Sequence, residues 1–348
     1  MKKNMDATKA PTVPILEEVQ FPSGVRGLPF YALLPLTTAY LVFSLFKDFL
    51  KNPLGFFSSK ERRPEQLPLP AYLEGLVHEH LDVGGGVKLH AVGFGRQPGK
   101  PLLLFLHGFP ECWYSWREQL AALRDRYEVL AVDMRGYNTS SKPKGLSAYT
   151  LERLTADVAA VVRGRGRSSC TLVAHDWGGV VAWTAAGRYP GLVDRLVVLA
   201  APHWLLYLRN RTADQMARSY YFLWFLLPVL PELLLTHTDS AFTSSLWLSG
   251  ADFGPLRRGA NSPADAEVYK AAALQPGAAT SALNYYRALL LTNLGLLPLH
   301  PEVAPRCQVH VLQECSHWIQ SDKPAELQRI LDDWLKAHPL GKAEDNGQ

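Results

Sequence analysis

Four short and almost uniformly apolar runs recur along the chain, each separated from the next by a stretch with helical character. They read LLLFLH at 102–107, VLAVD at 129–133, CTLVAHD at 170–176 and LVVLA at 196–200. Runs of this length without polar alternation are typical of strands buried on both faces, as in a parallel sheet covered by helices on either side. The pattern therefore predicts a doubly wound α/β core with a mostly parallel sheet.

A helical, aromatic-rich block interrupts this sheet pattern, and strand character returns only at 309–312 (VHVL). We therefore expect a helical lid inserted into the sheet domain. The predicted divisions are an amino-terminal segment (1–26), an apolar segment (27–46), a linker rich in proline and charge (47–78), the core (79–202 and 298–340) and the lid (203–297).

Residues 27–46 carry no charge and are long enough for a helix that crosses a hydrocarbon layer of about 30 Å. They predict a single-pass membrane anchor, with membrane lipid as a partner and the endoplasmic reticulum as the expected membrane. Pro29 and Pro35 leave a buried or amphipathic helix open as the alternative. Basic residues flank the segment on both sides, so its orientation is not fixed.

Composition narrows the classes of partner and cofactor. The net charge is only +4, and no cluster of Lys and Arg is interleaved with aromatic residues, so we expect no nucleic-acid partner. The four cysteines form no C-x-x-C pair and lie at no metal-ligand spacing. We expect free thiols, no metal site and no cofactor.

The motif with the clearest chemistry is TLVAHDWGG at 171–179, between a predicted strand and a predicted helix. It has the pattern of a nucleophile elbow, with Asp176 in place of the usual Ser and with small residues, Ala174 and Gly178, where strand and helix cross. A carboxylate is already charged at pH 7 and can displace a leaving group at saturated carbon to form an ester. The next N–H, that of Trp177, is a candidate oxyanion donor. The alternative is an ordinary Asp that caps the following helix.

Further motifs follow predicted strands or lie in the lid, namely HGFPECW at 107–113, DMRGY at 133–137, LNYYR at 283–287 and SHW at 316–318. In the first of them, the Phe109 N–H is a second candidate oxyanion donor, and Trp113 is a candidate substrate contact. His317 comes after the last predicted strand and after the nucleophile in chain order, where this kind of fold places its base. A surface histidine at a strand end is the alternative.

These motifs, taken with VAHDWGG and in this order, resemble the epoxide hydrolases of the α/β-hydrolase fold, closest to the membrane-anchored epoxide hydrolases 3 and 4. The resemblance covers about 81–335. It implies that Asp176 forms an ester with a lipophilic epoxide, such as a fatty-acid epoxide, that His317 activates the water which hydrolyses this ester, and that a diol is released. It also implies two lid tyrosines as proton donors, Tyr286 from N-x-Y-R and Tyr221, with Tyr220 as the other register. Ordinary lid packing is the alternative for these tyrosines.

The chain departs from this family before His317, where a strand and a catalytic acid are expected and only Glu302 and Glu314 offer carboxylates. One alternative is that CQVHVL at 307–312 fills the missing strand's place and displaces His317. Losing the orienting acid of a triad costs about 10⁴ in turnover. We therefore expect ester formation to outpace hydrolysis, and a catalytically dead or binding-only isoform stays open. So does a haloalkane dehalogenase, which shares the Asp elbow, although the lid tyrosines argue against it.

Overall fold

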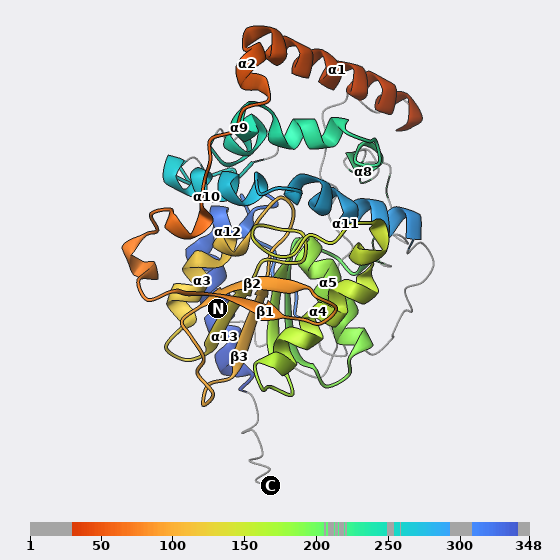
Figure 1. The fold of residues 1–348 in the computed structure, drawn as a ribbon. Coiled ribbons are helices and arrows are strands. Elements are labelled where there is room, and N and C mark those ends of the chain that lie inside the picture. Colours follow the sequence, from red (N-terminus) through yellow and green to blue (C-terminus); the bar gives the residue numbers. More distant parts are fainter. Residues whose placement is uncertain are drawn as a thin grey trace, which may run out of the picture.

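The computed structural model describes residues 30–204, 221–248, 254–257, 259–292 and 308–339, together with positions 207, 212, 215 and 219. A sheet with helices on both faces forms the core, and a layer of helices caps one end of it (Figure 1). The strands are β1 (Val77–Asp82), β2 (Lys88–Gly93), β3 (Leu102–Leu106), β4 (Glu128–Val132), β5 (Cys170–His175) and β6 (Val193–Leu199).

Helices fall into three groups along the chain. The amino-terminal pair is α1 (Phe30–Lys51) and α2 (Pro53–Phe56). The core helices are α3 (Arg117–Leu123), α4 (Leu151–Gly164), α5 (Trp177–Arg188), α12 (Ile319–Asp322) and α13 (Pro324–Ala337). The lid helices are α8 (Tyr221–Trp224), α9 (Leu230–Leu248), α10 (Pro263–Ala273) and α11 (Ala278–Thr292), and short 3₁₀ turns lie at Pro64–Gln66, Ala71–Leu73, Trp113–Trp116 and Leu146–Tyr149.

The sheet has the strand order β1-β2-β4-β3-β5-β6. Strands β4, β3, β5 and β6 run parallel, as the four apolar runs predict, whereas β1 and β2 pair antiparallel at one side. Side chains of β3 alternate between the two faces. Leu103 and Phe105 join the cluster with α3 and α13, and Leu104 and Leu106 join the cluster with α4 and α5. This two-sided burial explains why the run is apolar throughout.

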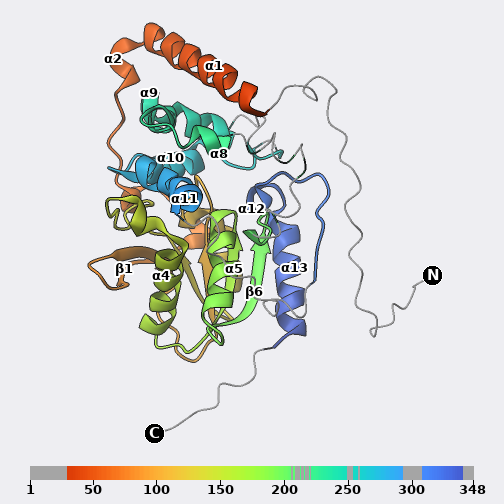
Figure 2. The same ribbon diagram turned by 90° about the vertical axis from the view of Figure 1, so that its right-hand side faces the viewer.

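The prediction of a strand at 309–312 is wrong, because the structure describes these residues without a strand. No ladder includes these residues, and Val309 and Val311 are 70% and 75% exposed. Valine-rich tetrapeptides favour an extended backbone, but a strand forms only where a neighbour supplies the ladder hydrogen bonds. Among the described residues β6 is therefore the last strand of the sheet, with α13 beside it (Figure 2).

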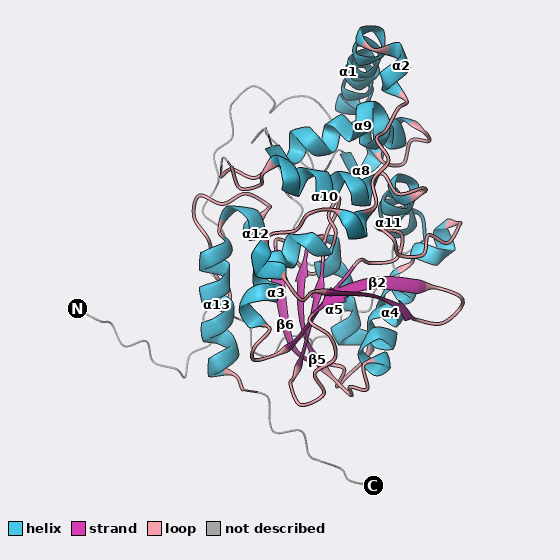
Figure 3. Ribbon diagram, turned by 60° about the vertical axis from the view of Figure 1, so that its left-hand side comes forward, coloured by secondary structure: helices cyan, strands magenta, loops and turns pink. Residues whose placement is uncertain are grey.

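The lid lies between the sheet and the amino-terminal helices (Figure 3). Helix α1 runs on to Lys51, past the predicted end of the apolar segment at residue 46. It contacts α2 and α8, and α2 contacts α9. Within the described part of the chain, no helix combines the length and the apolar character that crossing a membrane requires. Residues 27–29 of the predicted anchor lie outside that part.

Candidate active site

Asp176 occupies the sharp turn between β5 and α5. Its backbone has φ +48° and ψ −119°, a conformation that costs a non-glycine residue about 1–3 kcal/mol. A Cβ on Gly178 would lie 2.5 Å from the Leu106 carbonyl oxygen, which is why the elbow needs glycine there. The Asp176 side chain makes no capping hydrogen bond to α5, so the helix-cap interpretation is wrong.

The loop after β3 brings a backbone donor to this carboxylate. The Phe109 N–H donates to Asp176 Oδ1 over 2.8 Å. Gly108 permits the close approach, because a Cβ there would lie 2.5 Å from the Asp176 Cβ. Trp177 is the first residue of α5, and N–H groups in the first turn of a helix have no partner within the helix. The Phe109 N–H thus contacts the Asp176 side chain, and the second predicted oxyanion donor, the Trp177 N–H, belongs to the next residue along the chain.

His317 lies next to the same carboxylate, with Nε2 3.5 Å from Asp176 Oδ2. The alternative that this histidine is displaced is therefore wrong. Its ring lies 4.6 Å from that of His175 and 5.1 Å from that of Trp318, measured between centroids. Trp318 in turn contacts Trp247 at 4.7 Å. Within the described structure, aromatic packing thus helps to hold this segment in place without a strand.

The surroundings of Asp176 keep it ionised. Burial alone would raise the pKa of this carboxyl, but hydrogen bonding and charge from His317, the charge of His175 and the Phe109 N–H together lower it below the ordinary 3.8. At neutral pH the group is a carboxylate with one oxygen on a backbone donor. This is the protonation state that a nucleophile requires.

A buried chain of polar groups links the Phe109 loop to the backbone of His317. Glu111 Oε2 accepts the Gly108 N–H at 2.7 Å and lies 2.7 Å from His175 Nδ1. His175 Nε2 donates to the His317 carbonyl oxygen over 2.9 Å. Since both ring nitrogens face acceptors, His175 donates from both and is an imidazolium. Sequence reasoning missed Glu111 and His175, although both stand inside the quoted motifs.

The two predicted lid tyrosines lie together over the elbow. Tyr286 on α11 is 2% exposed, and its ring centroid lies 4.9 Å from Trp177 and 6.1 Å from Tyr221 on α8. Burial first, and the Asp176 charge in addition, raise the pKa of both hydroxyls above the ordinary value. Both therefore stay protonated and are able to donate a hydrogen bond. Tyr220 lies outside the described residues.

Arg287, next to Tyr286, fixes one tyrosine relative to the other. Its guanidinium donates to the carbonyl oxygens of Phe225 and Leu227 at 2.8 Å each and pairs with Glu232 at 2.7 Å. These carbonyls follow directly after α8. The arginine of the LNYYR motif thus ties α11 to the turn that follows Tyr221.

Two expectations about this site need correction or stay open. Trp113 is 2% exposed, packs edge-on to His78 and Tyr114, and donates its backbone N–H to Asp133, so its described contacts are with the core and its contact with substrate stays a prediction. Its place in the motif reflects the loop's anchoring. The acid that is expected to orient His317 has no replacement among the described residues. Of these residues, Asp176 alone forms an ion pair with His317.

The acids near His317 are accounted for in other ways. Asp322 accepts the N–H groups of Ser316 and Arg257 at 2.8 Å each. Glu314 is exposed, and Glu302 lies outside the described residues. The geometry therefore gives His317 a target in Asp176, but within the described structure it has no orienting carboxylate.

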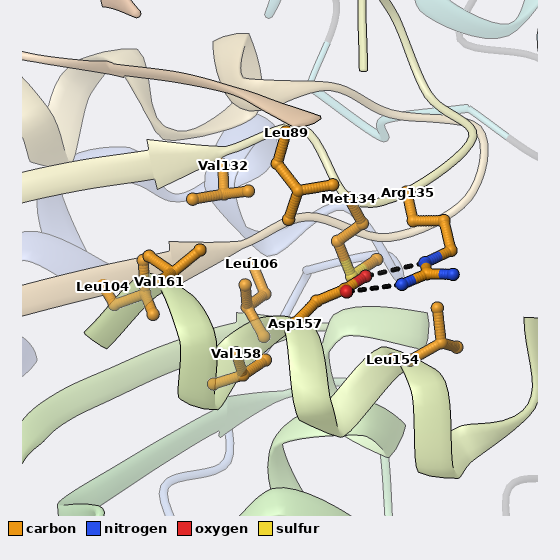
Figure 4. A pocket seen from close by; sticks show the side chains of 10 residues that line it. All are labelled: Leu89, Leu104, Leu106, Val132, Met134, Arg135, Leu154, Asp157, Val158 and Val161. Carbon is orange, nitrogen blue, oxygen red and sulfur yellow. Dashed lines mark hydrogen bonds and ion pairs between the residues drawn. The ribbon is translucent and has the colours of Figure 1, made fainter. Parts of the chain in front are cut away.

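A small internal void of about 10 Å³ lies between the sheet and α4 (Figure 4). It is about large enough for one water molecule. Beside it, Arg135 and Asp157 form a buried ion pair, with Nε 2.8 Å from Oδ2. None of its lining residues is a candidate site residue, so this void is a feature of core packing.

Comparisons with known proteins identify the family. A family model described as alpha/beta hydrolase fold matches residues 101–236. The chain is 33% identical over 345 residues to epoxide hydrolase 3 of Xenopus tropicalis, covering 90% of this chain and 93% of that protein. The chain belongs to the epoxide hydrolases. Epoxide hydrolase 4 of Homo sapiens is 34% identical, over 72% of this chain and 76% of its own length.

Solved epoxide hydrolases share the fold. The Bacillus megaterium epoxide hydrolase in complex with an inhibitor superposes with a TM-score of 0.64 at 30% identity, covering 74% of this chain and 100% of that chain. Epoxide hydrolase VrEH1 from Vigna radiata gives a TM-score of 0.62 at 25% identity, over 76% and 99% of the two chains.

In this epoxide hydrolase, we expect Glu111→Gln to lower the free energy of unfolding by about 3–5 kcal/mol in mildly acidic solution, because it leaves a charged His175 buried without its partner. Burial opposes the charge on each group. The pairing nevertheless raises the pKa of His175 above 6.5 and lowers the pKa of Glu111 below 4.5.

The pH dependence follows from these directions. The contribution of His175 to the stability of the fold is complete below about pH 6.5 and is lost as pH rises through the raised pKa of this residue. The contribution of Glu111 to stability is complete above about pH 4.5 and is lost as pH falls through the lowered pKa of this residue. Urea unfolding of wild type and variant should therefore differ most between these limits, with the exposed Glu152→Gln as control. A difference that is no larger in mildly acidic solution than at the highest and lowest pH measured would contradict this assignment.

Proposed function

We propose that this protein opens lipophilic epoxides to vicinal diols through an ester on Asp176. The observation that carries the proposal is the convergence on one carboxylate of a backbone donor, a histidine, the buried Tyr286 and the partly buried Tyr221. The rings of Phe109 and Phe225 pack beside the Tyr286 ring, and such apolar surroundings favour an apolar substrate. Fatty-acid epoxides fit this description.

In the first step, Asp176 Oδ2 attacks an epoxide carbon and the bond from that carbon to the ring oxygen breaks. The oxygen leaves as an alkoxide and takes a proton from one of the two tyrosines, Tyr221 or Tyr286. The other tyrosine stabilises the new hydroxyl with a hydrogen bond. Asp176 Oδ1, held by the Phe109 N–H, becomes the ester carbonyl oxygen. The result is a hydroxyalkyl ester of Asp176 and one deprotonated tyrosine.

In the second step, His317 takes a proton from water as the hydroxide attacks the ester carbonyl carbon. The N–H groups of Phe109 and Trp177 stabilise the tetrahedral oxyanion. Collapse of that intermediate breaks the bond to the alkyl oxygen, which leaves as an alkoxide, and Asp176 becomes a carboxylic acid. The His317 imidazolium and the Asp176 carboxyl then release one proton each. The alkoxide takes one and becomes the second hydroxyl of the diol, the tyrosinate takes the other, and the Asp176 carboxylate is restored. The lack of a described acid beside His317 makes this the slower step.

We also propose that the amino-terminal segment attaches the enzyme to a membrane, with the endoplasmic reticulum as the expected site. The support is the uncharged sequence at 27–46 and the affinity of lipophilic epoxides for lipid. Attachment would place the enzyme where its substrates partition.

We expect Tyr286→Phe and Tyr221→Phe each to slow epoxide ring opening by about 10²-fold, because each removes one proton donor to the leaving oxygen. Single-turnover mixing with a terminal aryl epoxide measures this rate as ester plus diol. The control is Tyr285→Phe on the same helix. The Tyr285 hydroxyl donates to the Arg135 carbonyl oxygen at 2.7 Å, so its loss should cost about 1 kcal/mol of stability and leave ring opening unchanged. Ring opening at the wild-type rate in both single variants and in the double variant would refute the donor role and, with it, the proposed chemistry.

A further inference from the structure

The outermost helices of the molecule, α1 and α2 (Figure 1), expose several large apolar side chains. We call this set of side chains the outer face of α1 and α2, and it consists of Tyr40, Phe43, Phe46, Leu50, Leu54 and Phe57. Exposure of these side chains ranges from 55% at Phe46 to 92% at Leu54. Exposed apolar patches on a soluble surface mark a contact with a partner or a membrane.

The opposite side of the same helices is already covered. Leu41 and Leu45 of α1 are buried, and so is Phe56 of α2, whose ring lies 5.2 Å from that of His237 on α9. Helix α1 packs on α8 and α2 packs on α9. A helix that is apolar on all sides is normally buried on all sides. Among the described side chains of α1, those on one side are covered by the lid and those on the other side face outward.

The segment after α2 is fastened to the lid by ion pairs. The Arg62 side chain is only 4% exposed, and it contacts Asp239 at 2.6 Å and Glu267 at 2.7 Å. Its hydrogen bonds lower the pKa of Asp239, and Lys270 adds to this from 2.8 Å. The amino-terminal helices are therefore part of the lid and not a loose tether. A partner that binds the outer face of α1 and α2 is therefore attached to the lid through these helices.

Charge at the edge of this surface favours anionic lipid over a second apolar protein surface. Lys47 and Lys51 are exposed on α1, and Lys60 and Arg63 are exposed just beyond α2. Apart from Arg62, whose side chain is buried, residues 40–63 hold four Lys or Arg and two Asp or Glu, a net charge of +2. Aromatic and aliphatic side chains bordered by basic residues are the pattern of helices that lie in a membrane surface. Each basic residue near an anionic surface contributes about 1 kcal/mol.

We propose that the outer face of α1 and α2 lies in the surface of an anionic lipid membrane, with α1 parallel to that surface and the lid directly above it. This proposal rests on the membrane attachment proposed above and specifies how it occurs. The contact lies on the membrane surface and includes Leu50, Leu54 and Phe57, which follow the segment 27–46. Helix α8, which carries Tyr221, packs against α1. Lipophilic substrate dissolved in the bilayer would thus meet the lid first.

The test uses the full-length protein without substrate, so that its result is independent of the epoxide chemistry. Binding to phosphatidylcholine vesicles with and without phosphatidylserine is measured by sedimentation. The variant Leu50→Ser/Leu54→Ser/Phe57→Ser should lose on the order of 10²-fold or more in partition constant, because three apolar side chains no longer enter the lipid. The matched control is Leu256→Ser/Val309→Ser/Val311→Ser, which alters three exposed apolar side chains elsewhere. Removing phosphatidylserine should weaken wild-type binding.

Two results would overturn the proposal. Wild-type binding by the triple variant would mean that residues 27–46 alone attach the protein, as a crossing helix would. Absence of binding by wild type, with a dimer that the triple variant converts to monomer, would make the outer face a contact between copies. Should the triple variant misfold, a fluorophore on Leu54→Cys, with Cys307 and Cys315 replaced by Ser, gives an independent reading. Shallow nitroxide lipids should quench it, and no quenching would overturn the proposal.

Discussion

Replacing Asp176 with Asn should abolish ester formation and diol release together, with a loss in turnover on the order of 10⁴-fold or more. An amide oxygen is uncharged and a poor nucleophile, so ring opening has no attacking group. Asn tolerates a left-handed backbone better than most residues, which suits the φ of +48° at this position. We therefore expect the fold to survive, and circular dichroism with thermal unfolding would verify this.

The control for this variant is Asp333→Asn on α13, which neutralises an exposed carboxylate outside the site. It should leave both steps unchanged. A turnover of Asp176→Asn within about tenfold of wild type, or an ester that still forms in this variant, would show that another residue attacks the epoxide.

Replacing His317 with Gln should separate the two steps. Ring opening should stay within a few-fold of wild type, because Asp176 keeps its Phe109 donor and both tyrosines. Ester hydrolysis should fall by about 10²-fold or more, because no group remains to take the proton from water. The ester would then accumulate in a burst equal to the enzyme concentration. His310→Gln, an exposed histidine on the same segment, is the control.

The result for His317→Gln also bears on the missing acid. If wild type already hydrolyses its ester slowly, the burst will be visible in wild type too, and the variant will deepen it. Equal hydrolysis rates in wild type and variant would show that His317 is not the base. A simultaneous loss of ring opening would show that its charge is needed to position Asp176.

Local signals explain which parts of this fold were predictable. Strands β3, β4 and β5 are buried along their whole length, and β6 carries an apolar run at its end, so their runs stand out in the sequence. The elbow was predictable because its geometry excludes side chains at Gly178. Strands β1 and β2 were missed, since VHEHLD of β1 mixes polar and apolar residues at the edge of the sheet.

Tertiary arrangements were less accessible from the sequence. The run 309–312 has strand composition, yet whether it pairs depends on a neighbour that composition does not specify. The position of His317 was also uncertain, because the packing of Trp318 against Trp247 supports it in place of a strand. The Glu111 to His175 chain connects three separate segments, and only the folded structure brings them together.

Covalent capture on Asp176 tests the central claim most directly. Wild-type protein is mixed with excess terminal aryl epoxide, quenched in acid and digested, and the peptides are weighed by mass spectrometry. We predict that the peptide containing Asp176 gains the full mass of the epoxide, since ring opening expels no leaving group, and that this gain is absent from Asp176→Asn. No adduct together with no diol, or an adduct on a different residue, would contradict it.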